Sequence, residues 1–443
     1  MDVVVIGAGE VGSSIAASLA DHHEVVVIDV DADRVEALTY SHDVLAIHGD
    51  GTSMGVLQEA GAGAADILIA STDDDETNLV ACSTAAVLGE AFTIARVRNT
   101  TFLETWRHAE GAFGVDFMVC TNLLTAETIV RIAGLPAARD VDPFAGGRVQ
   151  MAEFSVDEAS PLAGQTVAEA DRIEGLTFAA VIDEEDVVIP RGETVIRPGA
   201  KVVVIGPPES VGAFADTVAA AGDRTRDVVV LGGDAIGRET VDLLCDRGVQ
   251  PTVVEADADR ARILAERCAD ATVLNHDPTD VEFLLREHVD KADLAVVTLE
   301  TDERTLLVSL LARQIGTRRT VAVVNRGEYV QLFEAVGVDV AINPRELTAE
   351  EITRFTHDEH TENVALIESD RAEVVEVEVD ADSALVGRPI HEAVADLPAP
   401  VVVGAITRDG EVITPRGETV VRPGDHVVVF VETPAVDDVL AAL

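Results

Sequence analysis

The residues best suited to chemistry in this chain are three glycines and an acid near its beginning. Gly7, Gly9 and Gly12 form a GxGxxG pattern directly after an apolar run, and a second apolar run ends at Asp29. Glycines at this spacing permit a tight turn, a close approach of backbone to a diphosphate, and close packing of a helix on a strand. Asp29 follows Gly12 by 17 residues, close to the spacing of about 20 at which an acid binds a ribose in βαβ units. The pattern predicts a nucleotide site.

A strand and a helix must hold this turn in place. The β-branched run at residues 3–6 predicts a strand buried on both faces, and the apolar positions in 14–20 predict a helix packed on it. The N-terminus of that helix would face the phosphates. Asp29 or Asp31 could instead cap the helix that starts near Asp33. The order of strand, turn, helix, strand and acid favours ribose binding by Asp29.

Strand and helix patterns alternate through the first part of the chain. Apolar strand patterns recur near Val3, Val25, Val44, Ile67 and Thr93, each followed by a helical pattern. This alternation predicts an α/β fold with a Rossmann-like, doubly wound parallel sheet. A nucleotide would bind where the strand order reverses, at the carboxyl edge of the sheet.

The chain is a tandem duplication. Gly232 follows Gly7 by 225 residues in a similar apolar stretch, and the segment PRGETVxRPG occurs at 190–199 and again at 415–424, shifted by the same amount. Two unrelated segments at one offset identify an internal repeat. Each half also carries a Leu-Thr-Ala-Glu helix, at 122–131 and 345–354, that could cross to a neighbouring lobe.

Each half consists of a predicted doubly wound sheet followed by a small β-rich α+β segment, whose size favours pairing with a partner. The expected boundaries are 1–135 for the first nucleotide-binding domain, 136–148 for a linker, 149–222 for the first small domain, 223–357 for the second nucleotide-binding domain, 358–371 for a second linker, and 372–443 for the second small domain. The RGET segments are read as turns and not as binding loops.

The charge of the chain is extreme. Its 443 residues include 81 Asp and Glu against 32 Lys and Arg, which gives a formal charge of −49, while 47% of the residues are hydrophobic. Because the acids are spread over segments that look folded, we interpret them as a solvated surface adapted to high salt. The same charge argues against a nucleic-acid partner, which requires a basic face.

Cysteine, histidine and hydropathy patterns add little chemistry. The four cysteines have no metal-binding spacing and are expected to be buried and apolar; they are Cys82, Cys120, Cys245 and Cys268. His357 and His360 form an HxxH pattern in a polar stretch, which is read as a linker and not as a metal site. No apolar run reaches the roughly 18 residues of a membrane span, and no signal-like segment is apparent, so we expect a cytoplasmic protein.

Taken together, these motifs resemble a known family over essentially the whole chain. The resemblance is carried by VVVIGAGEVG, IDVDADR, HGDGTS, TDDDETN, ARVRN and the two PRGETVxRPG segments. The chain resembles the TrkA family of regulatory subunits of Trk potassium-uptake systems, in which a KTN or RCK-N domain and an RCK-C domain occur twice.

The resemblance implies a function as well as a fold. It implies a protein peripheral to the inner face of the membrane that binds NAD(H) or ATP/ADP and gates a potassium transporter subunit of the TrkH type. It also implies a homo-oligomer, expected to be a dimer of tandem chains that forms a ring of four nucleotide-binding lobes.

The resemblance assigns site residues by position. The turn that would hold the diphosphate comprises Gly7, Ala8, Gly9, Glu10, Val11 and Gly12, and Asp29 would bind the ribose. Asp50 would approach the adenine, or else cap the next helix. Ser71 and Thr72 would reach the nucleotide from the carboxyl edge of the sheet. Arg96 and Arg98 would face the outer phosphates, with a structural ion pair as the alternative.

The second half departs from this pattern. Its equivalents are Gly232, Gly237, Glu255 and Asp277. However, Asp234 takes the place of Gly9, and Val323 and Asn325 replace the two arginines. Each change removes affinity for phosphate, so we expect the second half to bind nucleotide weakly, to bind a less phosphorylated ligand, or to be structural.

Two other functions share the glycine fingerprint. An NAD-dependent oxidoreductase needs a second domain with an acid or base over the nicotinamide. Residues 149–208 contain no His, Cys or Tyr and a single lysine, Lys201, while His391 and His426 have no counterparts in the first half. This composition argues against an enzyme. A nucleotide or redox sensor without a transporter partner remains the third reading, because fold alone does not fix function.

Overall fold

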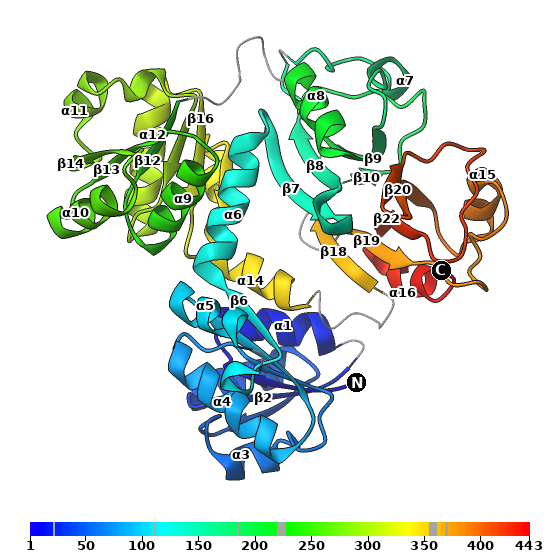
Figure 1. Cartoon of the computed structure of the whole chain (residues 1–443), viewed down its shortest axis with the longest axis horizontal. Helices are drawn as coiled ribbons and strands as arrows, with labels where there is room; N and C mark the ends of the chain where they lie inside the picture. The colour runs from blue at the N-terminus through cyan, green and yellow to red at the C-terminus, as the bar shows by residue number, and fades with distance from the viewer. Residues whose placement is uncertain are drawn as a thin grey trace. The chain divides into compact units, whose positions relative to one another are not determined.

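The computed structural model describes residues 1–20, 23–109, 111–158, 160–183, 186–218, 227–353, 361–367 and 371–443. The chain forms two compact units, and each unit combines a piece of both halves of the duplication. The first unit comprises residues 1–130 and 226–356, and the second comprises 131–225 and 357–443 (Figure 1). The predicted HxxH pair lies outside the described residues.

The first lobe, residues 1–130, is built on a six-stranded parallel sheet of order β3-β2-β1-β4-β5-β6. Its strands are β1 (Asp2–Ile6), β2 (Glu24–Asp29), β3 (Leu45–His48), β4 (Ile67–Ala70), β5 (Phe92–Val97) and β6 (Phe117–Cys120). The strand order reverses between β1 and β4, which opens a crevice at their carboxyl ends. This confirms the predicted Rossmann-like sheet.

Helices connect the strands of this lobe and cover its sheet. They are α1 (Glu10–Ala20), α2 (Ala32–Ser41), α3 (Met54–Glu59), α4 (Asp75–Leu88), α5 (Thr100–His108), a 3-10 turn (Ala112–Gly114) and α6 (Thr121–Gly134). Acidic N-caps fix two of the helix starts, because the side chain of Asp31 accepts the Asp33 amide and that of Asp74 accepts the Thr77 amide.

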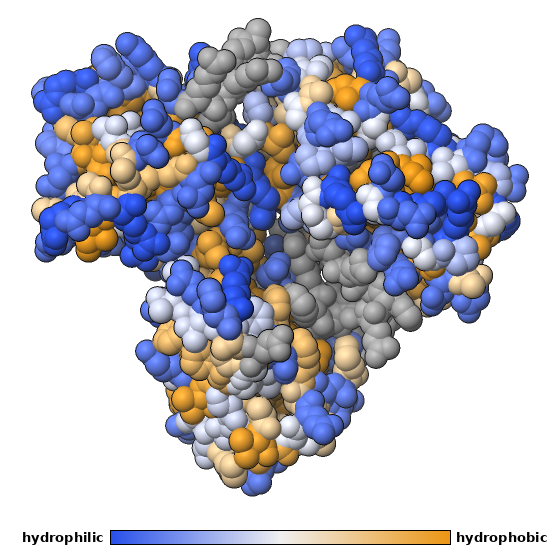
Figure 2. Space-filling model, viewed as in Figure 1, coloured by the Kyte–Doolittle hydropathy of each residue, from blue (hydrophilic) through white to orange (hydrophobic). Residues whose placement is uncertain are grey.

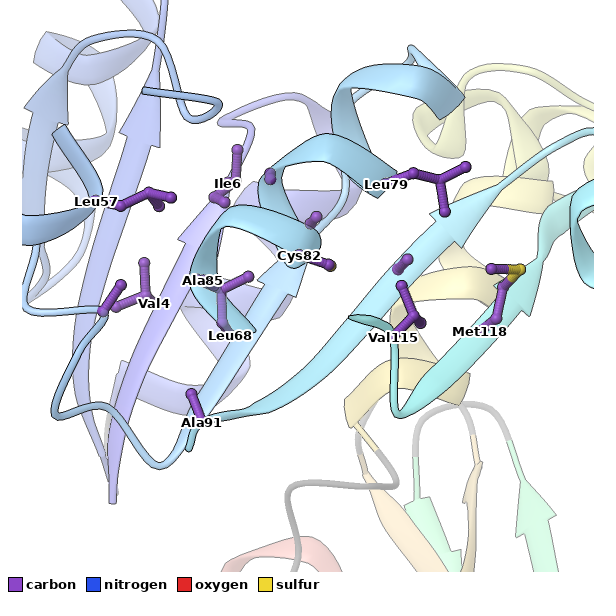
Figure 3. Packing of buried hydrophobic residues seen from close by; sticks show 14 of the residues in the cluster. Val4, Ile6, Leu57, Leu68, Leu79, Cys82, Ala85, Ala91, Val115 and Met118 are labelled. Carbon is purple, nitrogen blue, oxygen red and sulfur yellow. The ribbon is translucent and has the colours of Figure 1, made fainter. Parts of the chain in front are cut away.

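One face of the first sheet packs against α3 and α4. Figure 3 shows Leu79, Cys82 and Ala85 of α4 lying against strand residues that include Leu68 and Val4. All of these side chains are at most 6% exposed. Their burial fixes α4 and therefore the loop between β4 and α4, which forms one wall of the crevice.

The second lobe, residues 227–353, repeats this architecture with sheet order β14-β13-β12-β15-β16-β17. Its strands are β12 (Val228–Leu231), β13 (Thr252–Glu255), β14 (Thr272–Asn275), β15 (Leu294–Val297), β16 (Arg319–Val323) and β17 (Val340–Ile342). Its helices are α9 (Ala235–Asp246), α10 (Ala258–Arg267), α11 (Val281–Arg286), α12 (Asp302–Ile315), α13 (Val330–Ala335) and α14 (Pro344–Thr353), with 3-10 turns at Val289–Lys291 and Gly327–Tyr329.

Helix α14 packs on the first lobe although it belongs to the second half. It lies along α1 (Figure 1), and its Ala349 and Ile352 join the apolar cluster that contains Ile15 and Leu19 of α1. Ile352 is fully buried. A crossing of this kind was expected for the Leu-Thr-Ala-Glu helices, and α14 confirms it.

The second unit contains two five-stranded antiparallel sheets, of order β10-β9-β11-β8-β7 and β18-β19-β22-β20-β21. The first has β7 (Ala138–Phe144), β8 (Val149–Ser155), β9 (Thr177–Asp183), β10 (Asp186–Val188) and β11 (Lys201–Gly206), with α7 (Val167–Ala170), α8 (Pro208–Val218) and a 3-10 turn (Ala145–Gly147). The second has β18 (Thr361–Ile367), β19 (Ala372–Glu378), β20 (Val401–Arg408), β21 (Glu411–Ile413) and β22 (His426–Glu432), with α15 (Ile390–Ala393), α16 (Val436–Leu440) and 3-10 turns at Val394–Asp396 and Thr433–Ala435.

The two small domains share one core. Phe144 and Ile205 of the first sheet and Val374 and Phe430 of the second belong to a single cluster of buried side chains. A Cβ placed on Gly404 would lie 2.5 Å from Ile205 Cδ1, so the two sheets approach very closely there. The pairing expected for domains of this size is therefore made within the chain.

Two expectations from the sequence are corrected. Residues 136–148 are not a bare linker, because most of them form β7 and the following 3-10 turn, which pair with β8 and complete the first small sheet. The Pro143 and Gly146–Gly147 pattern suggested a loop, yet an edge strand tolerates proline. Cys82 and Cys120 are free and buried as expected, whereas Cys245 and Cys268 form a disulfide between the ends of α9 and α10.

The surface reflects the composition. Figure 2 shows hydrophilic residues spread over the face in view, with hydrophobic patches among them. The core is assembled chiefly from valine, alanine, isoleucine and leucine.

Candidate nucleotide-binding site

A cavity of about 720 Å³ opens at the carboxyl ends of β1, β2 and β4 in the first lobe. Its walls are the turn after β1, the ends of β2 and β4, the loop after β3, and Arg96 of β5. This is the place at which the reversal of strand order predicts a ligand site. One wall residue, Arg345, comes from α14 of the second half.

The glycine turn has the geometry that the sequence predicts. Gly7 has a φ of +102°, which favours glycine, and a Cβ on Gly12 would collide with the Gly7 carbonyl oxygen. A Cβ on Gly9 would instead meet only Arg34 Nη1, at 3.7 Å. Gly12 therefore closes the helix onto the turn, while Gly9 leaves backbone open toward the cavity. Of the six predicted turn residues, all but Gly12 line the cavity; they are Gly7, Ala8, Gly9, Glu10 and Val11.

Asp29 holds this turn in place through a hydrogen bond to its backbone. The carboxylate is 7% exposed; its Oδ2 accepts the Ala8 amide at 2.6 Å, and its Oδ1 accepts the Asp31 amide at 2.7 Å. Asp31 is the N-cap of α2, so Asp29 does not have the capping role that was considered as its alternative. Asp29 lines the cavity, and a carboxylate accepts up to about four hydrogen bonds, which leaves capacity for ribose hydroxyls.

Asp50 and two hydroxyl residues also line the cavity. Asp50 Oδ1 accepts the Thr52 amide at 2.9 Å and the Thr52 hydroxyl at 2.7 Å, and these bonds hold the pKa of the carboxyl below its usual value. Asp50 thus stabilises the turn before α3 and is not the N-cap of that helix, which is Ser53. Ser71 Oγ donates to the Ile6 carbonyl at 3.2 Å, and Thr72 Oγ1 donates to Asn78 Oδ1 at 2.6 Å.

The two predicted phosphate-binding arginines differ in position. Arg96 is 4% exposed and lines the cavity, with Nε donating to Thr121 Oγ1 at 3.1 Å and Nη1 to Asp73 Oδ1 at 3.2 Å. Burial lowers its pKa, although Asp73 acts in the opposite direction. Arg98 lies outside the cavity wall, where it pairs with Asp75 and donates to the Asp73 carbonyl. The structural ion pair considered as the alternative is therefore what Arg98 forms.

The equivalent turn in the second lobe is filled by the chain itself. Asp234, which replaces Gly9, accepts the Gly237 amide at 2.8 Å and so caps α9. A phosphate would need that same helix N-terminus. Burial raises the pKa of the Asp234 carboxyl. A Cβ on Gly233 would lie 2.5 Å from Leu264 Cδ1, so the turn is also covered by α10.

The acids of the second lobe are neutralised internally. Glu255 Oε2 accepts the Gly233 amide at 2.5 Å, as Asp29 does for Ala8. Its Oε1 pairs with Arg260 at 3.1 Å, which is closer than the 3.9 Å between Arg34 and Asp29. Asp277 Oδ1 pairs with Arg304 at 3.2 Å. Val323 is buried in place of Arg96, and the Asn325 amide donates to Asp302. The fold of the first site is thus preserved without its open turn or its buried arginine.

The donor set of the first lobe fits an adenine nucleotide. Open backbone at the start of a helix suits a diphosphate, a buried carboxylate suits a ribose, and guanidinium groups suit outer phosphates. The cavity volume lies within the range of about 300–1,000 Å³ that is usual for small-molecule sites.

Comparison with known proteins identifies the family. The TrkA-N domain family matches residues 3–120 and 228–344, and the TrkA-C domain family matches residues 151–219 and 374–443. The chain belongs to the TrkA family. It is 36% identical to the "Trk system potassium uptake protein TrkA homolog" of Archaeoglobus fulgidus, with 99% of both chains covered. It is 31% identical to "Trk system potassium uptake protein TrkA" of Halomonas elongata, over 97% of this chain and 96% of that one.

Solved structures share the fold of this family member. The "GsuK channel bound to NAD" matches all of this chain and 79% of its own, with a TM-score of 0.63 and 21% identity. The "Crystal Structure of the GsuK RCK domain" matches all of this chain and 95% of its own, also with a TM-score of 0.63 and 21% identity. Within the described part of the chain, no helix is long and apolar enough to cross a membrane.

Sequence reasoning missed two cavity arginines. Arg34 lies on α2 with Nη1 3.9 Å from Asp29 Oδ2. Its signal was present in the IDVDADR motif, since Arg260 repeats it in the second half. Arg345 carried no such signal, because a residue on α14 reaches the first lobe only through the crossing of the two halves.

Proposed function

We propose that this chain is the nucleotide-binding regulatory subunit of a Trk-type potassium-uptake system. In this proposal it sits at the inner face of the cell membrane and gates a potassium transporter subunit of the TrkH type. The observation that carries the proposal is the open glycine turn of the first lobe, whose cavity is closed on one side by a helix of the second half. A ligand there contacts both halves of the duplication.

The proposed ligands are adenine nucleotides, namely ATP/ADP or NAD(H). All carry the adenosine ribose that Asp29 would bind. The fold neighbours support this range, since one is titled as bound to NAD and another, with a TM-score of 0.50, as bound to ADP. A carboxylate at this position disfavours a 2′-phosphate and hence NADP.

The asymmetry of the two lobes supports one nucleotide per chain. The first turn exposes Gly9, while the second turn already holds the Asp234 carboxylate at the N-terminus of α9. The second lobe then serves as a structural partner that responds to the first.

A regulatory role fits the cavity better than catalysis. The described residues that line it include Asp, Glu, Ser and Thr, but none is His, the side chain that most often transfers protons in catalysis, and none is Lys, Tyr or Cys. The relatives named above are likewise titled as potassium uptake proteins and not as enzymes.

The mechanism we propose is a population shift in a ring of chains, formed by a dimer of this tandem chain. Nucleotide binding favours one arrangement of the two lobes, and the ring passes that preference to the transporter. A ligand can do this only through different affinities for the two arrangements.

The test is potassium flux into vesicles that contain the purified transporter subunit with the full-length chain bound. We expect ADP or ATP, or NADH or NAD, to change the flux for the wild type and to leave it unchanged for Gly9→Asp. Flux that ignores every nucleotide while the chain binds one would refute the gating role. Failure of the chain to bind the transporter would favour a sensor without this partner.

A further inference from the structure

The cavity of the first lobe is incomplete without Arg345, a residue of the second half. Arg345 lies in the first turn of α14, and its side chain, which lines the cavity, is 37% exposed. Helix α14 is anchored there by the burial of Ile352 against α1. The position of the guanidinium therefore follows from core packing and not from a flexible surface loop.

The guanidinium is held at the cavity by acids of the first lobe. Its Nη1 lies 2.5 Å from Glu10 Oε2, and its Nη2 lies 4.0 Å from Asp73 Oδ2. Glu10 is the first residue of α1, and its Oε1 also accepts the Gly327 amide at 3.1 Å. The N-terminus of α1, where a phosphate would bind, is thus flanked by a carboxylate that the second half holds with two donors.

A phosphate bound at the cavity rim would need a cation that can exchange its ion-pair partner. A phosphate near the start of α1 would approach the Glu10 and Asp73 carboxylates, which repel it. Arg96 cannot turn toward it freely, because it is 4% exposed and donates to Thr121, Asp73 and two backbone carbonyls. Arg345 is exposed enough to exchange one oxyanion partner for another, and its planar fork suits two phosphate oxygens.

The duplication provides an internal comparison. The Leu-Thr-Ala-Glu segments align Arg345 with Asn122 of α6, and the Asn122 amide donates to the Arg98 carbonyl. The second half thus supplies an arginine to the cavity with the open Gly9 turn. The first half has an asparagine at this position, and it bonds within its own lobe.

We propose that Arg345 is a phosphate ligand of the first-lobe site, held by Glu10 until a nucleotide's outer phosphate displaces that carboxylate. This deepens the proposed function and rests on it. When Arg345 leaves Glu10 and pairs with a phosphate, α14 becomes linked to the bound nucleotide. Because α14 belongs to the second half, that half is linked to the nucleotide as well. A second contact also joins α14 to the cavity wall. Thr348 of α14 donates to Thr121 Oγ1 at 3.0 Å, and Thr121 Oγ1 accepts a hydrogen bond from Arg96.

The proposal is tested by titrating ADP and adenosine into the full chain in molar KCl. For Arg345→Gln we expect ADP affinity to fall at least about tenfold, the loss of one charge-assisted contact, with adenosine affinity changed less than about twofold. The matched control is Arg313→Gln, which removes a similarly exposed arginine paired with Asp339 at 2.5 Å, outside the cavity wall. It should leave both affinities unchanged.

Glu10→Gln separates a ligand from a structural ion pair. If Arg345 is held back by Glu10, this variant frees it and ADP binds more tightly than to the wild type. If the pair only fixes α14, both variants weaken ADP and adenosine alike, which overturns the proposal. Arg345→Gln that binds ADP as the wild type does also overturns it. A wild type that binds neither ligand overturns the nucleotide site itself.

Discussion

At the scale of single residues, the two halves differ where a ligand would touch them and agree where the fold requires it. Gly7 and Gly232 both have positive φ, and Asp29 and Glu255 both accept an amide of the glycine turn. The difference lies in Gly9 against Asp234. One residue leaves the helix N-terminus open, and the other caps it.

Substitution of the turn glycines should separate binding from folding. Gly9→Ala points a methyl group into the cavity, so we expect nucleotide binding to weaken at least about tenfold with little change in melting temperature. Gly12→Ala drives a methyl group into the Gly7 carbonyl, so the free energy of unfolding should fall by about 2 kcal/mol or more. Titration and calorimetric melting of both variants check this, and an equal loss of stability would contradict the assignment of Gly9 to the ligand.

Asp140 of β7 gives a pH prediction. Burial, followed by the charges of Asp142 and Glu153, raises the pKa of this carboxyl to about 7. Because the folded state then binds the proton more tightly than the unfolded state, Asp140 costs stability as the pH rises from about 4 to 7. Asp140→Asn should therefore raise the melting temperature more at pH 8 than at pH 5. Asp157→Asn, at an exposed position, serves as the control. If Asp140→Asn raises the melting temperature equally at both pH values, the raised pKa of Asp140 is refuted.

At the scale of elements, α14 packs one half of the duplication against the other in the first unit. Its sequence neighbours build the second lobe, but its apolar side chains complete the cover of α1. The cavity wall therefore depends on an element from outside its own domain.

Truncation of the α14 anchor tests this packing. Ile352→Ala leaves a void beside α1 and should lower the free energy of unfolding by about 2–5 kcal/mol. It should also weaken nucleotide binding, because Arg345 loses its position. Ile263→Ala, at a residue 46% exposed on α10, should cost less than about 0.5 kcal/mol. Urea unfolding of both variants measures these losses in the free energy of unfolding. Equal losses would argue against a buried α14.

The sequence predicted elements better than it predicted their contacts. Both parallel sheets, the small β-rich domains and the crossing helices follow from hydrophobic period and glycine placement, which are local. The positions of Arg98 and Arg345 do not, because each depends on which residues the tertiary fold places beside it. Residues 136–148 were read as a linker since Pro143 and the two glycines that follow signal a loop. The edge strand β7 accommodates the proline, and the glycines lie in the 3-10 turn after it. The pairing of Cys245 with Cys268 likewise joins two helices whose approach no spacing rule states.

At the scale of the whole molecule, duplication produces two units that each mix both halves. The wall of the first-lobe cavity is therefore shared between the two copies of the duplicated domain. The whole chain carries a formal net charge of −49.

That charge predicts dependence on salt. Self-repulsion is unscreened in dilute buffer and weakens as the screening length falls from about 30 Å at 0.01 M to about 3 Å at 1 M salt. The melting temperature should rise markedly with KCl over this range. A melting temperature that stays flat would remove the interpretation of the acids as an adaptation to high salt.

We propose that each chain binds one nucleotide, in the first lobe. The most direct test of this proposal is calorimetric titration of the full chain in molar KCl with ATP, ADP, NADH and NAD, repeated on Gly9→Asp, which places the second-lobe residue in the first. We predict saturable binding of one nucleotide per chain that is lost in this variant and retained in Asp234→Gly. Binding that survives Gly9→Asp, or two nucleotides per wild-type chain, would contradict a single site in the first lobe.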